Sequence, residues 1–296
     1  MAEASGLTLI QKDRLDPLNA TTYGTGELIK CALDAGCKKI ILGIGGSATN
    51  DGGAGMASAL GVRFLNADGD ELAPGGGYLQ ELDKICIEHI DKRIYETEII
   101  VASDVTNPLC GSTGASAVFG PQKGATPEMV EHLDRSLSHY ASKIKEQLSI
   151  SIRDFPGSGA AGGLGGGLIA FLQAKLKPGI DIILDLIDFE NEVKKADLVI
   201  TGEGKTDIQT SYGKAPMGVG LRAKKHGVPV ICISGSLDQG HENLEKHGIC
   251  AFFSIMDKPQ SLEVAIENTD RLMEETVKTL WNYISYLTGK YIPLLL

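Results

Sequence analysis

The chain has 296 residues, of which 43% are hydrophobic and 22% are charged, an ordinary composition for a globular protein of one large or two modest domains. Its formal net charge is −10, from 38 acidic and 28 basic residues, which argues against nucleic acid or an anionic membrane surface as a partner. No apolar run approaches the roughly 18 residues needed to cross a membrane. The six cysteines show no metal-ligand spacing and no secretory signal precedes them, so we expect reduced thiols in a cytoplasmic protein.

The first predicted helix and strand lead into a glycine-rich loop. Residues 25–36 show a helical pattern that Thr25 caps and Gly36 ends. An apolar run at 40–44 predicts a short buried strand, and a helix of small residues is expected over 54–60. Between this strand and helix lie five glycines and four small polar residues, namely Gly45, Gly46, Gly52, Gly53, Gly55, Ser47, Thr49, Asn50 and Asp51.

This loop has the residue types of an anion site. Glycine lets the backbone approach a ligand closely, so that N–H groups can face an anion, while the hydroxyl, amide and carboxyl groups supply directional contacts. A glycine-rich bend without any chemistry is the alternative interpretation. The spacing matches neither the G-x-x-x-x-G-K-[ST] nor the G-x-G-x-x-G motif, so the loop alone does not identify its ligand.

A second predicted strand, at 99–102, also ends in a polar cluster. Residues 62–90, which precede it, alternate apolar pieces with turns and predict hairpins. The strand continues into Ser103, Asp104, Thr106 and Asn107. Because ligands of open α/β sheets bind at the carboxyl ends of strands, Asp104 and Asn107 join the candidate site.

The strongest helix signal in the chain begins at Thr126. Thr126 is a capping residue, Pro127 occupies the first turn, and Glu128 lies near the positive end of the helix dipole. Apolar residues then recur at three- and four-residue steps as far as residue 148. His132 and His139 lie seven residues apart on this helix, and we interpret them as solvated or rim residues rather than metal ligands.

A second glycine-rich stretch occupies residues 156–167 and precedes a helix expected over 168–176. It contains the candidate ligand-binding residues Gly157, Ser158 and Gly159. Glycines near a helix cost stability relative to alanine, so they indicate either close backbone packing or a bound group at the helix start. The sequence leaves these two interpretations open.

From residue 194 onward the pattern changes to a regular alternation of strands and helices. Strands are expected at 198–201, 228–233 and 251–255, with a helix ending at Gly227 and a long helix over 262–287. This alternation predicts an α/β domain with a parallel, doubly wound sheet. We therefore place the domain boundary near residue 195, giving predicted domains 1–194 and 195–296.

Four polar clusters follow predicted strands, and together they suggest a crevice for phosphoryl transfer. Asp51 and Asp207 are the candidate bases for a substrate hydroxyl, and Asp104 and Glu203 are candidates to hold Mg²⁺ or its waters. Lys214 is the candidate catalytic cation, although a single lysine is more often a surface charge. The candidate substrate- and phosphate-binding residues are Gly45, Gly46, Ser47, Thr49, Asn50, Asn107, Lys123, Gly157, Ser158, Gly159, Gln209 and Thr210.

The same segments resemble a known family. GIGGSATNDGGAG at 43–55, SDVTNP at 103–108, VFGPQKGA at 118–125 and VITGEG at 199–204 resemble the bacterial glycerate kinases of the type that forms 2-phosphoglycerate. The resemblance covers essentially the whole chain and implies ATP-dependent phosphorylation of D-glycerate with Mg²⁺, so the expected partners are this acid and a nucleotide. It also implies two α/β lobes, a mixed middle lobe and a Rossmann-like lobe built from both ends of the chain.

One departure from the family pattern concerns the N-terminus. Family members carry an additional segment with a strand and an Ala-Pro-Asp-Ser-(Phe/Tyr)-Lys loop, so we expect the Rossmann-like lobe to be incomplete at its N-terminus. The alternative function is a non-catalytic ligand-binding fragment of the same fold. A nicotinamide-dependent oxidoreductase fits the fold class alone, because the dinucleotide-binding motif is absent. The sequence leaves open which hydroxyl is phosphorylated and whether the chain forms a homodimer.

Overall fold

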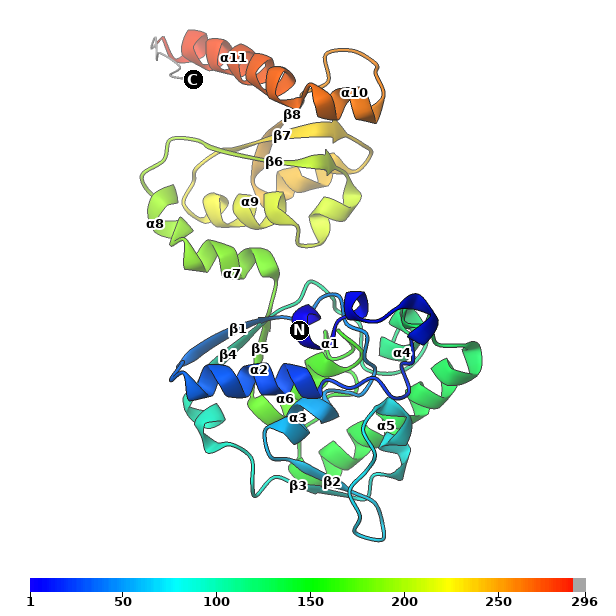
Figure 1. Cartoon of the computed structure of the whole chain (residues 1–296). Coiled ribbons are helices and arrows are strands. Elements are labelled where there is room, and N and C mark those ends of the chain that lie inside the picture. Colours follow the sequence, from blue (N-terminus) through cyan, green and yellow to red (C-terminus); the bar gives the residue numbers. More distant parts are fainter. Residues whose placement is uncertain (290–296) are drawn as a thin grey trace. The chain divides into compact units, whose positions relative to one another are not determined.

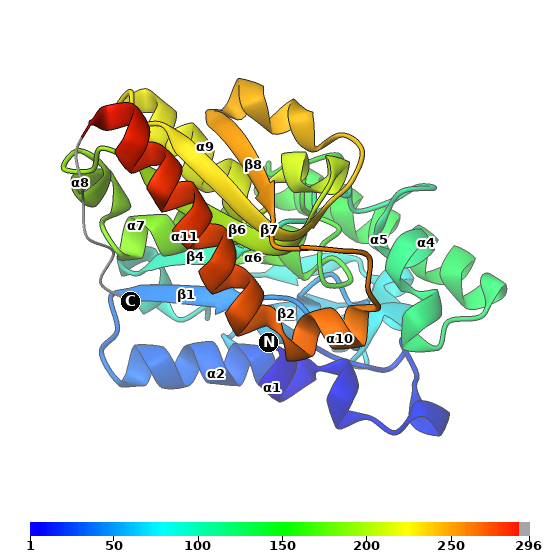
Figure 2. The same cartoon turned by 90° about the horizontal axis from the view of Figure 1, so that it is seen from above.

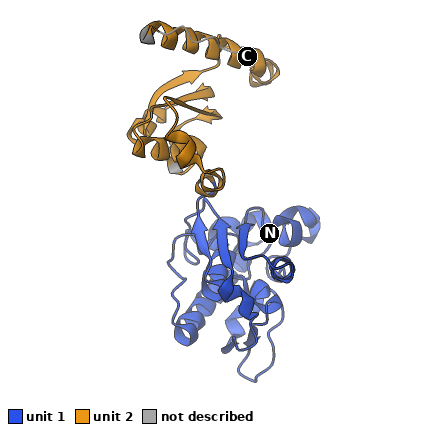
Figure 3. Cartoon of the chain, turned by 90° about the vertical axis from the view of Figure 1, so that its left-hand side faces the viewer, with its two compact units in different colours: residues 1–179 blue, residues 180–296 orange. Residues whose placement is uncertain are grey.

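The computed structural model describes residues 1–289 and divides into two compact units (Figure 1, Figure 3). Unit 1 is Met1–Gly179, and unit 2 begins at Ile180. The last residues of the predicted second domain, 290–296, lie outside the described residues. Both units combine helices with parallel strands, which confirms the predicted α/β class.

Unit 1 is built on a three-stranded parallel sheet in the order β1-β4-β5. A separate antiparallel pair, β2 and β3, matches the hairpin region expected at 62–90. The strands of this unit are β1 (Lys39–Gly43), β2 (Arg63–Leu65), β3 (Lys84–Cys86), β4 (Glu98–Ala102) and β5 (Lys175–Lys177). The α-helices that lie wholly within this unit are α1 (Ala2–Ser5), α2 (Tyr23–Asp34), α3 (Ala54–Ala59), α4 (Ala115–Phe119), α5 (Pro127–Leu148) and α6 (Leu164–Leu172).

The long helix α5 begins where its sequence signal predicted. The Thr126 hydroxyl accepts a hydrogen bond from the Met129 N–H, and the apolar stripe of the helix is buried in the core of unit 1. His132 and His139 are half-buried, as expected for rim residues. Their Nε2 atoms lie 2.8 Å from the Gly77 carbonyl and 2.6 Å from the Leu82 carbonyl, so both histidines tie α5 to the neighbouring 3₁₀ helix.

Unit 2 is a three-layer arrangement around a parallel sheet in the order β6-β7-β8. Its strands are β6 (Val199–Thr206), β7 (Val230–Leu237) and β8 (Ile249–Ser254). Its helices are α7 (Gly179–Leu186), α8 (Phe189–Val193), α9 (Ala215–Lys225), α10 (Leu262–Glu267) and α11 (Thr269–Thr288). α8 and α9 cover one face of this sheet, and α10 and α11 lie on the other (Figure 1, Figure 2).

The alternating side chains of β7 explain these two layers. Val230 and Cys232 pack toward α9, whereas Ile231 and Ile233 join the core beneath α11. Successive strand residues point to opposite faces, so an apolar run of this kind needs helices on both sides. The helix expected over 262–287 is divided at Asn268 into α10 and α11.

The two units divide earlier than the boundary near residue 195 that the strand pattern suggested. The intervening helices α7 and α8 belong to unit 2 because they pack on α9. The Arg222 guanidinium of α9 lies 3.2 Å from the Asp181 carboxylate and 2.7 Å from that of Asp185, both on α7. Val193 of α8 shares a core with Ala223. Across the described part of the chain, no helix is both long and apolar enough to span a bilayer.

Candidate functional site

The predicted site residues are divided between the two units. Those at 45–50 and Asp51 follow β1, Asp104 and Asn107 follow β4, and Asp207 follows β6, as expected for the carboxyl ends of parallel strands. Glu203 lies inside β6, which is longer than the strand expected at 198–201, and Lys123 and residues 157–159 belong to segments between helices. Glu203, Asp207, Gln209, Thr210 and Lys214 belong to unit 2, and all the others belong to unit 1.

The two glycine-rich stretches of unit 1 pack against each other. The Gly52 N–H donates to the Gly162 carbonyl at 3.0 Å, and the Gly159 N–H donates to the Asn107 carbonyl at 3.0 Å. Gly162 has a φ of +69°, and a Cβ there would lie 1.9 Å from the Thr49 carbonyl oxygen. Close backbone packing therefore explains why position 162 is a glycine. The same packing joins the loops after β1 and β4 to the segment before α6.

The helix that follows the second stretch begins earlier than expected. α6 starts at Leu164 instead of 168, so three glycines lie within its first turns. A Cβ at Gly165 would lie 2.3 Å from the Gly157 carbonyl oxygen, and one at Gly167 would lie 2.4 Å from the Gly52 carbonyl oxygen. These contacts favour the packing interpretation of the 156–167 stretch over that of a bound group.

Asp51 is buried and organises the first glycine loop. Its carboxylate accepts hydrogen bonds from the Thr22 N–H and hydroxyl, both at 2.8 Å, and from the N–H groups of Gly53 at 3.1 Å and Gly55 at 3.2 Å. Burial raises the pKa of Asp51, and these hydrogen bonds oppose the rise. Because its oxygens are already used inside the fold, this geometry suits a positioning residue rather than the base predicted from the sequence.

Lys123 braces the same loop from a different segment. It is only 1% exposed, and its ammonium donates to the Thr49 carbonyl at 2.7 Å. Burial lowers the pKa of Lys123 to about 8, although attraction to Asp51 raises it. In this structure the ammonium is thus occupied inside unit 1, so its predicted contact with phosphate has no geometric support.

Other predicted polar residues of unit 1 are also enclosed. The Asn50 side-chain amide donates to the Ser116 hydroxyl at 2.9 Å, and the Ser158 hydroxyl donates to the Phe155 carbonyl at 2.7 Å. Ser47 forms an antiparallel bridge with Gly6. Within residues 1–289, the buried Thr49 Oγ1 and Asn50 Oδ1 have no hydrogen-bond partner. The structure therefore places these four side chains inside the loop rather than on its surface.

The accessible part of the unit 1 cluster is smaller than the predicted one. Gly45, Gly46 and Asp104 are exposed, and Asn107 is half-buried. The Asp104 carboxylate accepts from the Gly179 N–H at 2.9 Å, and the Asn107 amide donates to the Thr113 carbonyl at 2.8 Å. A Cβ at Gly45 would meet no atom within 4 Å. These exposed groups are the ones that a small polar ligand can reach.

The unit 2 cluster is held by two threonines and a capping box. The Glu203 Oε1 accepts from the hydroxyls of Thr210 at 2.6 Å and Thr206 at 3.1 Å. The Asp207 carboxylate accepts from the Gln209 N–H at 2.8 Å, while the Thr210 hydroxyl accepts from the Asp207 N–H. The two acids are thereby fixed four residues apart at the end of β6.

Lys214 follows this cluster as the N-cap residue of α9. It is exposed, and α9 has Pro216 in its first turn. A lysine at the N-terminus of an eleven-residue helix combines a full positive charge with unpaired backbone N–H groups, which is a favourable environment for phosphate.

A magnesium site was predicted at Asp104 and Glu203, and this remains a prediction. The described residues contain no group of three or more His, Cys, Asp or Glu side chains arranged to hold a metal. Mg²⁺ in kinases usually takes one or two carboxylates, phosphate oxygens and several waters, so sparse carboxylates are compatible with its chemistry. Glu203 offers such a carboxylate, already oriented by its two threonine hydroxyls.

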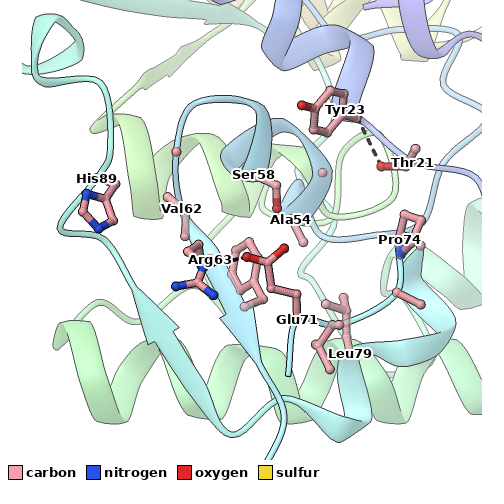
Figure 4. Close-up of a pocket in the computed structure, with 16 residues that line it drawn as sticks. Thr21, Tyr23, Ala54, Ser58, Val62, Arg63, Glu71, Pro74, Leu79 and His89 are labelled. Carbon is pink, nitrogen blue, oxygen red and sulfur yellow. Dashed lines mark hydrogen bonds and ion pairs between the residues drawn. The ribbon is translucent and has the colours of Figure 1, made fainter. Parts of the chain in front are cut away.

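A pocket of about 480 Å³ lies in unit 1 behind the Asp51 loop (Figure 4). Glu71 and Arg63 point toward each other there, with Arg63 Nε 2.6 Å from Glu71 Oε1. Thr21 and Gly55 form part of its wall, and both contact the Asp51 carboxylate. None of the predicted site residues lines this pocket, so it is separate from the candidate site.

The sequence matches the glycerate kinase family over residues 1–285. The chain belongs to the glycerate kinase family. This membership confirms the prediction that the protein is an enzyme, a glycerate kinase. It does not favour the alternative of a non-catalytic fragment. Glycerate kinase membership also disfavours the oxidoreductase interpretation.

Individual relatives of this glycerate kinase family member support the assignment. A glycerate kinase from Halalkalibacterium halodurans is 52% identical over 287 residues, which cover 95% of this chain and 76% of the relative. A glycerate 2-kinase from Escherichia coli K12 is 51% identical over 265 residues, covering 90% and 70%. A crystal structure from Salmonella typhimurium LT2, assigned provisionally to glycerate kinase 2, is 50% identical with a TM-score of 0.80, covering 97% of this chain and 74% of that one.

Some residues important to the site were missed by the sequence analysis. Thr22, Ser116 and Thr206 each hold a predicted site residue in place. Thr22 could have been found, because it is a capping-type residue immediately before α2, whereas Thr25 lies inside that helix. Ser116 has no local signal, since its partner Asn50 is 66 residues away.

Proposed function

We propose that this chain transfers the terminal phosphoryl group of ATP to the 2-hydroxyl of D-glycerate, forming 2-phosphoglycerate, and that the reaction requires Mg²⁺. The observation that carries the proposal is the family match over residues 1–285, together with 51% identity to a glycerate 2-kinase. Polar clusters at the carboxyl ends of parallel strands, found in each unit by itself, support it, because such ends are where ligands bind in α/β folds.

We assign the proton-accepting role to Asp207 rather than to Asp51. Asp207 is half-buried and oriented by its capping box, whereas the Asp51 oxygens accept from five donors within unit 1. A positioned general base contributes typically 10²- to 10⁴-fold to the rate. We therefore expect Asp207→Asn to lower kcat by about that factor.

We assign phosphate binding to Lys214 and the N-terminus of α9. The exposed backbone at Gly45 and Gly46 is our candidate for binding the glycerate carboxylate. Of the two predicted magnesium ligands we propose Asp104, because Glu203 lies at the edge of a unit 2 pocket and is available to the nucleoside of the donor instead. When bound, Mg²⁺ would neutralise charge on the phosphates.

The product of the reaction provides a direct test. The purified chain is incubated with ATP, MgCl₂ and D-glycerate, and the product is examined by proton-coupled ³¹P NMR. A phosphate on the 2-oxygen couples to one proton and gives a doublet, whereas one on the 3-oxygen couples to two and gives a triplet. A doublet that requires both ATP and Mg²⁺ is expected. A triplet, or no glycerate-dependent signal, would contradict the proposal.

Two lysines of α9 provide a matched pair for the phosphate assignment. Lys214 and Lys225 are both exposed but lie at opposite ends of the helix. Lys214→Ala should lower kcat/KM for ATP at least 10-fold, and Lys225→Ala should leave it unchanged. Equal effects of the two substitutions would show that only overall charge matters.

A further inference from the structure

A pocket in unit 2 is not explained by the residue roles assigned above. It has a volume of about 840 Å³ and lies at the carboxyl ends of β6 and β7, between the sheet and α10. Residues of β6 and β7 form its floor, and Leu262 and Ile266 of α10 with Met273 of α11 form its apolar wall. Small-molecule sites typically have volumes of about 300–1,000 Å³ and mostly apolar linings with a few polar groups.

The lining suits a flat heterocycle better than a small acid. Ile233, Ile255 and Met256 continue the apolar surface on the sheet side, and Glu203, Lys205 and Ser236 supply polar groups at its edge. Glycerate is a three-carbon acid whose oxygens would find few partners among these aliphatic side chains. A purine ring, in contrast, buries two large faces and presents hydrogen-bonding groups only at its edge.

Gly204 is the glycine of this pocket that neither packing nor backbone conformation requires. A Cβ at this position would meet no atom within 4 Å, and its φ lies outside the left-handed region. The two neighbouring pocket glycines differ, since a Cβ at Gly202 would lie 2.1 Å from the Ile233 carbonyl oxygen and one at Gly235 would lie 2.4 Å from that of Gly204. Packing explains Gly202 and Gly235, whereas the space at Gly204 is open to the close approach of another group.

Glu203 and Lys205 are available at the edge of this pocket. The two threonine hydroxyls orient Glu203 through one oxygen, Oε1, and a carboxylate so fixed can accept hydrogen bonds from ribose hydroxyls. Lys205 pairs with Asp238 at 2.8 Å, and both side chains are more than half exposed. Exposed pairs of this kind contribute little to stability, so Lys205 can exchange Asp238 for a phosphate at small cost.

We infer that this pocket binds the nucleoside part of the phosphoryl donor, with the purine ring over Gly204 and the ribose at Glu203. The inference rests on the proposed function, because it assumes that the donor is a purine nucleotide. It adds the location of the base and a specificity-determining position, Gly204.

The test fills the space above Gly204. Gly204→Val places a β-branched side chain on a strand, where it is well tolerated, and Gly204→Ala adds a single methyl group. The KM for ATP should rise at least 10-fold in Gly204→Val and less in Gly204→Ala, with no comparable rise in the KM for D-glycerate. ADP binding, measured by calorimetry without glycerate, should weaken in parallel. Ile200→Ala is the control, because Ile200 is an exposed residue of the same strand outside the pocket.

A second comparison addresses the ribose. The unsubstituted chain should bind ADP more tightly than 2′-deoxy-ADP, and Glu203→Gln should reduce that difference. If the unsubstituted chain shows neither turnover with ATP nor ADP binding, the proposed function fails and the inference with it. If turnover is normal but Gly204→Val leaves the affinity for ADP unchanged, or raises the KM for D-glycerate instead, the inference is overturned and the proposed function stands.

Discussion

The role of Asp51 can be tested by removing its carboxylate. Asp51→Ala leaves two buried N–H donors, those of Thr22 and Gly53, without an acceptor. An unsatisfied buried donor costs roughly 1–3 kcal/mol, so unit 1 should lose about 2–6 kcal/mol of unfolding free energy. Domains are typically stable by about 5–15 kcal/mol, so this loss is large enough to measure and small enough to leave folded protein.

Conservative substitutions at this position refine the estimate. In Asp51→Asn the amide oxygen can still accept from Thr22, but the amide nitrogen would then face the Gly53 N–H, so we expect a loss of about 1–3 kcal/mol. Thr22→Val removes one hydroxyl that donates to Asp51 and accepts from the Met56 N–H. Its cost should not add to that of Asp51→Ala, because both substitutions remove the hydrogen bond between the Thr22 hydroxyl and the Asp51 carboxylate.

The single tryptophan of the chain makes the assay selective. Trp281 lies in α11 of unit 2, so its fluorescence in urea follows unit 2, while far-UV circular dichroism follows both units. Asp51→Ala should shift part of the dichroism transition to lower urea and leave the fluorescence transition in place. A dichroism transition within about 1 kcal/mol of the unsubstituted chain would refute the reasoning. An Asp51→Asn variant with unchanged stability but a kcat reduced 10³-fold would restore Asp51 as the base.

Two further predictions concern the same loop. The pKa of Lys123 is about 8 in the folded chain and 10.5 ordinarily, so between these pH values the unfolded chain binds more protons than the folded chain. The free energy of unfolding of unit 1 should therefore rise from pH 8 to pH 9, by up to about 1.4 kcal/mol. Urea titrations at pH 7, 8 and 9 should show this rise in the unsubstituted chain and not in Lys123→Met. An equal pH dependence of stability in the two proteins would contradict the prediction. Gly162→Ala should destabilise unit 1 by well over 1 kcal/mol in the dichroism assay, because its Cβ would clash with the Thr49 carbonyl. Gly36→Ala is the control, because Gly36 has a φ of +80° but no atom lies within 4 Å of the added Cβ. This substitution should lower the free energy of unfolding by only about 1 kcal/mol, and equal losses for Gly36→Ala and Gly162→Ala would argue against the clash.

Local patterns were sufficient for the framework of this protein. The apolar runs that became β1, β4 and β7 and the cap at Thr126 act over a few residues, so they could be recognised without tertiary contacts. The positions of the two polar clusters after β1 and β4 followed from the same patterns, whereas β6 extends to Thr206, so Glu203 lies inside that strand rather than after it. The motifs also identified the family before any geometry was known.

What each polar or glycine residue does depended on contacts between distant segments. Asp51 and Asp207 look alike in the sequence, yet the first is enclosed by donors from α2 and its own loop while the second stays half-buried at the end of β6. Gly162 and Gly204 likewise look alike in the sequence, yet Gly162 has a positive φ and no room for a Cβ, whereas Gly204 has neither constraint. The sequence by itself determined the strands β1, β4 and β7, the helix α5 and the family, because these follow from local periodicity and motifs, whereas β5 begins in a segment expected to be helical and α7 and α8 were not predicted. Only the tertiary structure decided which acids and glycines hold the fold and which stay accessible, because burial and close approach are made by residues far apart in the chain.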